Sequence, residues 1–184
     1  TSCPGTDTCK LGITSSMGVN RAISTALKNP NGHSHLLEDP LIKGMHVKMS
    51  GCPNGCGRHH VADIGFHGAA MQTTEGNQLP AYELLVGGSY ENADLRYGQR
   101  VKGRVPAKMV PDITFKILEF YKNHRELNEP FKEFVQRVGK EPFEGIVAAL
   151  PKVGALGKET IDMYMDYDKS VLYKMERGEG ECSV

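Results

Sequence analysis

Apolar residues recur at helical spacing in three stretches of the chain. The first predicted helix is capped by Ser15 or Ser16 and ends near residue 29, because hydroxyl side chains favour the cap position. The second spans about 111–124 and opens on a proline, and the third spans about 129–139. The apolar faces expected to enter the core are Val19, Ala22, Ile23, Ala26 and Leu27; Ile113, Ile117, Phe120 and Tyr121; and Phe131, Phe134, Val135 and Val138.

Four shorter stretches, 45–49, 61–71, 81–86 and 100–105, predict strands. They carry alternating or β-branched residues, and a polar loop separates the second from the third. Together with the helices they predict an α+β fold. We expect a mixed β-sheet of about four or five strands, helices packed on one side of it, and cysteine-bearing loops along one edge.

The composition is that of a compact domain with a tail. Of the 184 residues, 39% are hydrophobic and 24% are charged, with 22 basic and 22 acidic side chains. A formal net charge of zero gives no electrostatic reason to expect nucleic acid or an anionic membrane as a partner, and no apolar run is long enough to span a bilayer. Paired thiols that hold a metal must stay reduced, which predicts a cytoplasmic location.

The ten residues 49–58 contain two cysteines, a proline and three glycines. Pro53 suits the first position of a helix, which would place Cys52 at the cap and Cys56 one turn later on the same side. The glycines on either side of Cys56 are poor helix-interior residues, so we interpret them as letting a bulky group approach the backbone. This stretch predicts a binding site with both sulfurs facing one centre.

A second pair of cysteines, Cys3 and Cys9, flanks a Pro-Gly turn near the start of the chain. The spacings Cys-x5-Cys and Cys-x3-Cys differ from the tight Cys-x2-Cys pairs of structural zinc sites. Four thiolates in two pairs favour a [4Fe–4S] cluster held by Cys3, Cys9, Cys52 and Cys56, and a helix N-terminus after Cys52 would offer it partial positive charge. A structural zinc domain, two disulfides and four unrelated buried thiols are the alternatives.

The two motifs resemble those of the sirohaem-containing nitrite and sulfite reductases, whose carboxy-terminal half carries Cys-x5-Cys and then Gly-Cys-Pro-Asn-x-Cys. The resemblance extends to the stretches 62–68 and 82–88, which read ADIGFHG and YELLVGG. It implies that residues 1–147 form the nitrite/sulfite reductase 4Fe-4S and sirohaem domain. Residues 148–184 are then a C-terminal extension, which we expect to be partly disordered.

The resemblance also implies a role in the six-electron reduction of nitrite to ammonia or of sulfite to sulfide. The electron donor would be a protein such as ferredoxin. The amino-terminal half of the same enzyme, absent from this chain, would supply most of the groups that bind the small anion. The chain opens at Thr1, two residues before Cys3, so we expect it to be part of a longer polypeptide.

The resemblance places a second role on Cys56, whose thiolate would be shared between the cluster and the sirohaem iron. Sirohaem carries many carboxylates, so its binding requires cationic or amide donors. Lys10, Asn54 and Arg58 are the candidates nearest to the motifs. A cluster-only electron-transfer module without sirohaem is the alternative.

The remaining polar residues near the motifs have simpler interpretations. At least one of the adjacent His59 and His60 is expected to face solvent, and His67 is a weaker candidate for a cofactor role. Cys182 is expected to be a free or peripheral thiol. Lysines and arginines on or beside the predicted strands are expected to extend over the sheet with their charges in water; they are Lys48, Arg100, Lys102 and Arg104.

Overall fold

A mixed sheet forms the centre of the computed structural model, which describes residues 1–30, 32–91 and 94–175. Strand β1 (Val47–Ser50) pairs in parallel with β2 (Ile64–Gln72), and β2 pairs antiparallel with β3 (Gln78–Val86). The two-residue strands β4 (Gln99–Arg100) and β5 (Val105–Pro106) both pair antiparallel with β3. Within the described residues the sheet has five strands, which confirms the predicted mixed sheet.

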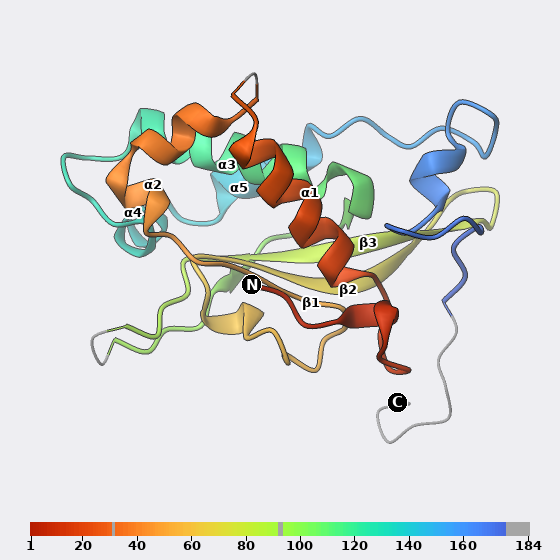
Figure 1. The fold of residues 1–184 in the computed structure, drawn as a ribbon. Coiled ribbons are helices and arrows are strands. Elements are labelled where there is room, and N and C mark those ends of the chain that lie inside the picture. The colour runs from red at the N-terminus through yellow and green to blue at the C-terminus, as the bar shows by residue number, and fades with distance from the viewer. Residues whose placement is uncertain (31, 92–93, 176–184) are drawn as a thin grey trace.

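The helices lie on one face of this sheet (Figure 1). They are α1 (Ser16–Lys28), α2 (Pro40–Lys43), α3 (Val110–His124), α4 (Phe131–Val138) and α5 (Glu141–Ala148). Short 3-10 turns occur at Gly5–Asp7, Ser34–Glu38, His59–Val61, Ala107–Met109 and Ile161–Tyr164. Ser15 caps α1 by accepting a hydrogen bond from Gly18 N at 3.2 Å, as predicted.

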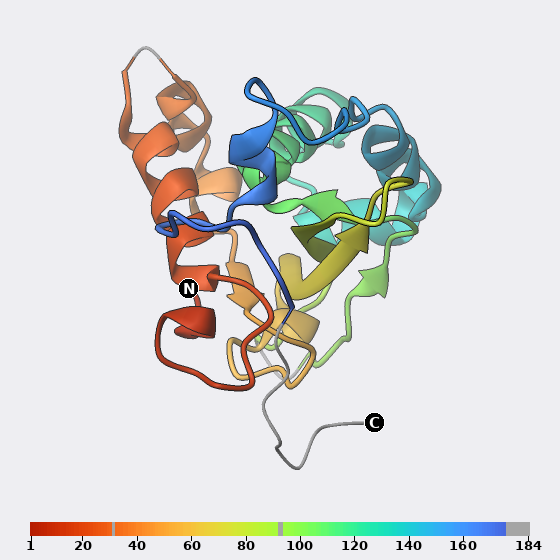
Figure 2. The same cartoon turned by 90° about the vertical axis from the view of Figure 1, so that its right-hand side faces the viewer.

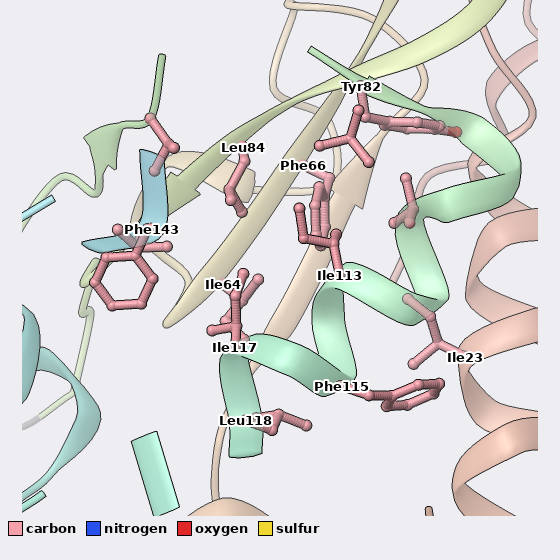
Figure 3. Close-up of a cluster of buried hydrophobic side chains, with 14 of the residues drawn as sticks. Ile23, Ile64, Phe66, Tyr82, Leu84, Ile113, Phe115, Ile117, Leu118 and Phe143 are labelled. Carbon is pink, nitrogen blue, oxygen red and sulfur yellow. The ribbon is translucent and has the colours of Figure 1, made fainter. Parts of the chain in front are cut away.

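The core lies between α3 and the sheet (Figure 3). Ile113 and Ile117 of α3 are fully buried and point toward β2 and β3, where they join Phe66 and Leu84 in one cluster. Phe115, on the side of α3 that faces α1, lies beside Ile23. The predicted apolar faces of the three helices are therefore core faces. Burying a side chain of this size stabilises a fold by about 1.5–3 kcal/mol.

Three sequence-based element predictions need correction. The stretch 100–105 is not one strand, because Gly103 has φ +105° and divides β4 from β5. Helices α2 and α5 were not predicted, because α2 has only four residues and α5 contains Pro142 and Gly145, which are poor helix formers. The third correction, at Cys52, concerns the candidate site and is described below.

The face of the sheet opposite the helices carries a polar row. Ser50 of β1 is the register partner of His67 in β2, and His67 is the partner of Glu83 in β3. Side chains alternate between the two faces of a strand, so these three residues lie on the face away from Met49, Phe66 and the rest of the core. The loop that joins β1 to β2 runs on the side of the sheet away from the helices (Figure 1).

After α5 the chain crosses back toward its own start. Residues 153–175 run past the β2–β3 hairpin and come to lie beside the N-terminal loop (Figure 2). The expected disorder of residues 176–184 and the position of Cys182 lie outside the described residues. The division of the chain at residue 147 stays a prediction.

Candidate metal centre

The first cysteine loop, residues 3–14, is tied at its start to strand β1. Met49 N donates to Thr1 O at 3.0 Å and Cys3 N donates to Met49 O at 3.1 Å, so the N-terminal residues extend the sheet beside β1. The loop then folds over the 3-10 turn Gly5–Asp7, where Cys9 N donates to Gly5 O at 2.9 Å. Ser16 Oγ donates to Cys3 O at 2.6 Å and so links the loop to α1.

The second cysteine loop, residues 51–58, follows β1 directly. It consists of bends and turns, so the predicted helix with Cys52 at its cap is wrong. Gly55 has φ +76° and Arg58 has φ +57°, backbone conformations that an α-helix does not contain. Arg58 N instead closes a tight turn by donating to Gly55 O at 2.7 Å. The positive end of a helix dipole is therefore not available at Cys52.

Gly51 joins the two loops. Its carbonyl oxygen accepts hydrogen bonds from Ile13 N at 2.8 Å and from Thr14 N at 3.0 Å. Its own N–H donates to Cys3 Sγ at 3.1 Å. A Cβ on Gly51 would come within 2.5 Å of Gly5 Cα, so only glycine allows this approach of the two backbones. The fold thereby brings the two cysteine motifs side by side, as both ribbon views show (Figures 1 and 2).

The glycines beside Cys56 have a different reason from the one predicted. A Cβ on Gly57 would overlap Met49 O, so this position is filled by the protein's own backbone and is not open to a cofactor. Gly57 N donates to Ser50 Oγ at 3.0 Å, which holds the loop against the end of β1. Gly55 is required by its positive φ.

The thiols of Cys3, Cys9 and Cys56 all lie within electrostatic reach of Cys52. Burial raises the pKa of the Cys52 thiol, and negative charge on Cys3, Cys56 and Cys9 raises that pKa further; the N–H of Asn54, which hydrogen-bonds to this sulfur, opposes the shift. Cys52 is 8% exposed and Cys3 is half-buried, whereas Cys9 and Cys56 are exposed. All four are free thiols, so the two-disulfide alternative does not describe this structure.

The arrangement of the thiols indicates whether they suit a single metal ion or a larger metal cluster. In the part of the chain that the structure describes, no group of three or more histidine, cysteine, aspartate or glutamate side chains is arranged to hold one metal ion. A tetrahedral zinc ion about 2.3 Å from each sulfur would need sulfurs only about 3.8 Å apart. Four soft donors from two facing loops suit a larger group, such as an iron–sulfur cluster.

The predicted cofactor-binding residues are all exposed. Lys10 lies on the first cysteine loop, and Asn54 and Arg58 lie on the second, on either side of Cys56. Lys10 and Asn54 are separated by 43 residues in the sequence, and the fold brings Lys10 onto the same pair of loops as the other two. Cys9 and Cys56, on the same two loops, are also exposed.

Beside the second loop lies a layer of histidines under the sheet. His59 is 1% exposed, and its Nδ1 shares a hydrogen bond of 2.8 Å with Ser50 Oγ. Burial, followed by the nearby His60 and His67, lowers the pKa of His59 to about 3, so its ring is neutral at pH 7. His60 is half-buried and stacks on His59 with ring centroids 3.8 Å apart.

Glu83 organises the charged end of this layer and was missed in the sequence. It is 6% exposed and pairs with Arg100 Nε at 2.7 Å, Arg104 Nε at 3.2 Å and His67 Nε2 at 3.4 Å. Burial alone would raise the pKa of Glu83, but the two guanidinium hydrogen bonds outweigh it and hold the pKa below its usual range. A lone glutamate among the apolar residues of strand 81–86 was the available signal.

Of the other cations expected to extend over the sheet, Lys48 is buried and Lys102 is exposed. Lys48 is 7% exposed, with Nζ 3.8 Å from the centre of the Tyr90 ring, and so does not extend into water as expected. Lys102 is exposed, and its backbone N–H donates to Glu144 Oε1 at 3.2 Å. No helix in the described part of the chain is long and apolar enough to cross a membrane.

The paired cysteine loops can be compared with known families. The model of the nitrite and sulphite reductase 4Fe-4S domain matches residues 1–152, which include all four cysteines. The chain belongs to this family. The sequence-based resemblance to nitrite and sulfite reductases is thus confirmed, as is the α+β fold expected from it.

Curated relatives of this family member include both kinds of reductase. It is 33% identical over 142 residues to a sulfite reductase [ferredoxin] of Synechococcus elongatus, covering 74% of this chain and 20% of the relative. It is 26% identical over 139 residues to an assimilatory ferredoxin-dependent nitrite reductase of Haloferax mediterranei, covering 76% and 22%. The chain therefore spans about a fifth of the length of these relatives.

Solved structures support the fold. The NirA protein of Mycobacterium tuberculosis superposes with a TM-score of 0.66 at 24% identity, over 77% of this chain and 26% of that one. The dissimilatory sulfite reductase DsrI superposes with a TM-score of 0.54 at 13% identity, over 100% of this chain and 58% of that one. At these identities the likeness concerns the fold alone.

Proposed function

We propose that this chain is the cluster- and sirohaem-carrying domain of an assimilatory-type nitrite or sulfite reductase. Cys3, Cys9, Cys52 and Cys56 are the proposed ligands of a [4Fe–4S] cluster. The observation that carries the proposal is the closure of the two cysteine loops at Gly51, which gathers four free thiols from two distant stretches of sequence. Membership of a 4Fe-4S domain family supports it.

The backbone around the thiols suits anionic sulfur. Gly51 N–H donates to Cys3 Sγ, and the N–H of Asn54 donates to the sulfur of Cys52. Such hydrogen bonds stabilise a thiolate and raise the reduction potential of a cluster that it ligates. The sequence predicted a helix dipole for this role. Local N–H groups take its place in stabilising the thiolates.

Cys56 is the proposed axial ligand that the cluster shares with the sirohaem iron. It is exposed on the second loop, and the exposed Asn54 and Arg58 flank it while Lys10 lies on the neighbouring loop. These donors suit the carboxylates of sirohaem. When bound, the two groups supply the redox chemistry, and the chain contributes ligation, orientation and hydrogen bonds.

The remaining parts of the reaction belong to partners. The basic groups that hold nitrite or sulfite, and much of the sirohaem pocket, are proposed to come from an amino-terminal half of the same enzyme. The lengths of two curated relatives support this proposal, since this chain spans only 20% and 22% of them. A donor such as ferredoxin is proposed to deliver the electrons, and the cytoplasm is the proposed location because the thiols must stay reduced.

An absorption spectrum of the protein purified without oxygen tests the proposal. Sirohaem bands together with cluster absorption support it. Cluster absorption alone, even after the chain is rejoined to the rest of the enzyme and supplied with sirohaem, would replace it with a cluster-only electron-transfer module. A colourless protein that contains zinc would replace it with a structural zinc domain.

The ligand assignment is tested by four single Cys→Ser variants. Each change at Cys3, Cys9, Cys52 or Cys56 is expected to lower bound iron and acid-labile sulfide to a small fraction of the wild-type content, because a cluster needs its thiolate ligands. Each is also expected to destabilise the loaded protein, since ligand binding stabilises the native state. Cys182→Ser is the control and should keep full iron. Full iron in any of the four variants would reassign that ligand.

The shared role of Cys56 needs a separate test in the chain joined to the rest of its enzyme. Cys56→Ser is expected to change the sirohaem spectrum directly. Cys3→Ser is expected to change it only through loss of the cluster. An unchanged sirohaem spectrum in the Cys56 variant would assign the axial position to another residue.

A further inference from the structure

The C-terminal segment 161–175, beyond the part of the chain matched by the family model, contacts the first cysteine loop at Ile13 and the α1 cap directly after that loop at Ser15. Asp166 is 4% exposed, and its Oδ2 accepts a hydrogen bond from Ser15 N at 2.7 Å. Tyr173 Oη donates to Ile13 O at 3.0 Å. These contacts join residues that are 151 and 160 positions apart in sequence. Figure 2 shows the segment beside the loop.

The contact at Asp166 continues to the turn between Cys3 and Cys9. Ser15, whose N–H is held by Asp166, donates through its Oγ to Asp7 Oδ1 at 2.9 Å. Asp7 belongs to the 3-10 turn on which the first loop is built. Asp166 thus fixes, through one intermediate residue, the backbone that carries the first pair of thiols.

The contact at Tyr173 continues to the second cysteine loop. Ile13, whose carbonyl is held by Tyr173, donates its N–H to Gly51 O, and Gly51 precedes Cys52. The segment therefore supports the point at which both loops meet. Both contacts therefore link the C-terminal segment to the backbone that supports the pair of cysteine loops.

The segment is anchored independently of the cysteine loops. Tyr164 is 1% exposed and its Oη donates to Gly154 O at 2.8 Å, while Tyr173 N donates to Tyr164 O at 2.7 Å. Met175 N donates to Gln78 Oε1 at 3.0 Å on the β2–β3 hairpin. Because these hydrogen bonds anchor the segment, it can in turn hold the first cysteine loop in place.

Hydrogen bonds dominate the contact between segment and loop. The two line an open pocket of about 280 Å³, whose lining includes Thr6, Gly12, Ile13, Asp166 and Tyr173. Close apolar packing is therefore incomplete there. Since a buried acceptor or donor that loses its partner is costly, the bonds to Ser15 and Ile13 carry most of the specificity of the contact.

We propose that residues 161–175 form a strap that positions the cysteine loops, with Asp166 and Tyr173 as its positioning residues. The strap sets how readily the first cysteine loop opens. Its effect on cluster retention rests on the proposed function, whereas its effect on the loop does not.

Hydrogen exchange in the full chain tests the strap without any cofactor. Asp166→Ala and Tyr173→Phe are expected to speed exchange of the amides of Thr6, Ile13 and Thr14 by about tenfold, while amides of β2 and β3 keep wild-type rates. Asp166→Asn is the conservative variant: its amide oxygen can still accept from Ser15 N, although its NH2 group then faces Tyr167 N, which donates to Asp166 Oδ1 at 2.9 Å in the wild type, so exchange should be slower than in Asp166→Ala.

Asp162→Ala is the matched control. Asp162 lies on the same strap but pairs with Lys108 at 3.1 Å, away from the cysteine loops, so its loss should leave loop exchange unchanged. Wild-type exchange in both Asp166→Ala and Tyr173→Phe, or an equal effect of Asp162→Ala, would overturn the proposal. If Asp166→Ala fails to fold, the exchange rates of Tyr173→Phe, which removes a single oxygen, decide whether the proposal holds.

The loaded protein provides a second readout. With bathophenanthroline disulfonate as the iron chelator, Asp166→Ala and Tyr173→Phe are expected to release iron several-fold faster than wild type and Asp162→Ala. Equal release rates in all four would contradict a role in cluster retention. A wild-type chain that takes up no iron and sulfide would overturn the proposed function, while the exchange rates would still decide whether the strap exists.

Discussion

At the scale of single residues, glycines and one buried hydroxyl determine the shape of the site. Gly51 allows the two loops to meet, and Gly57 allows the second loop to turn back over Met49 O. Ser50 Oγ then receives Gly57 N–H and shares a hydrogen bond with His59. The loop geometry around Cys52 and Cys56 follows from these close backbone contacts rather than from a helix.

Gly57→Ala is expected to destabilise the chain by about 1–3 kcal/mol, because its Cβ would overlap a backbone oxygen that has little room to move. Denaturant unfolding of the cofactor-free chain measures this. Gly145→Ala is the control: it is an exposed position in α5 with nothing within 4 Å of the new Cβ, and it should stabilise by about 0.5–1 kcal/mol. Equal effects of the two substitutions would contradict this account of Gly57.

At the scale of elements, one face of the sheet is apolar and buried, whereas the other carries charged side chains. The face toward α3 is filled by residues such as Phe66 and Leu84, whereas the opposite face carries Ser50, His67 and Glu83 in one cross-strand row. Glu83 draws Arg100 of β4 and Arg104, which precedes β5, onto that row. A single buried carboxylate in β3 thus ties together the two short segments that the sequence suggested were one strand.

Glu83→Gln is expected to destabilise the chain by about 1–3 kcal/mol at pH 7, since two guanidinium groups lose a charged acceptor. The folded-state pKa of Glu83 lies below the ordinary value of 4.5, so its stabilising contribution is fully present above that pH and is lost as the pH falls through the folded pKa. The difference in unfolding free energy between wild type and Glu83→Gln should therefore shrink in acid.

Urea unfolding at pH 7 and at successively lower pH values measures this difference. Glu75→Gln, at an exposed position in the β2–β3 turn, is the control and should change the stability by less than about 0.5 kcal/mol. If the difference in unfolding free energy between wild type and Glu83→Gln grows on acidification, the ion pairs of Glu83 do not stabilise the chain in the way described.

At the scale of the whole molecule, the chain corresponds to only part of the length of its relatives. It spans about a fifth of the curated relatives it matches, and the thiols of Cys9 and Cys56 are exposed on one pair of loops. Arg100 and Arg104 pair with Glu83, and Lys48 lies over the Tyr90 ring. Because they are engaged in these contacts, these three cations do not form a dedicated site for a small anion.

The isolated chain, even when loaded with a cluster, is therefore expected to show no measurable turnover of nitrite or sulfite. Reduction of an anion needs positive groups placed around the departing oxygens. Loss of nitrite or sulfite with reduced methyl viologen as electron donor measures this, and the chain joined to the rest of its enzyme is the positive control. Turnover by the isolated chain at about 1 s⁻¹ or faster, as is typical of enzymes, would contradict the prediction.

The sequence alone determined the helices with a clear apolar period, the long strands, the two cysteine pairs and the family. The faces of α1, α3 and α4 could be predicted because amphipathic spacing is a local property that burial then follows. The cysteine motifs were recognisable because their residue types and spacing are also local. None of these inferences required knowing which distant residues meet.

Only the tertiary structure decided how the site is assembled. The turn at Cys52 replaces a helix because Gly57 packs against Met49 O, and the row Ser50–His67–Glu83 exists because three strands align in one register. The support of Ser15 by Asp166 spans 151 residues. Such contacts depend on the packing of elements far apart in the chain, and a local pattern of residues carries no information about which of them will be neighbours.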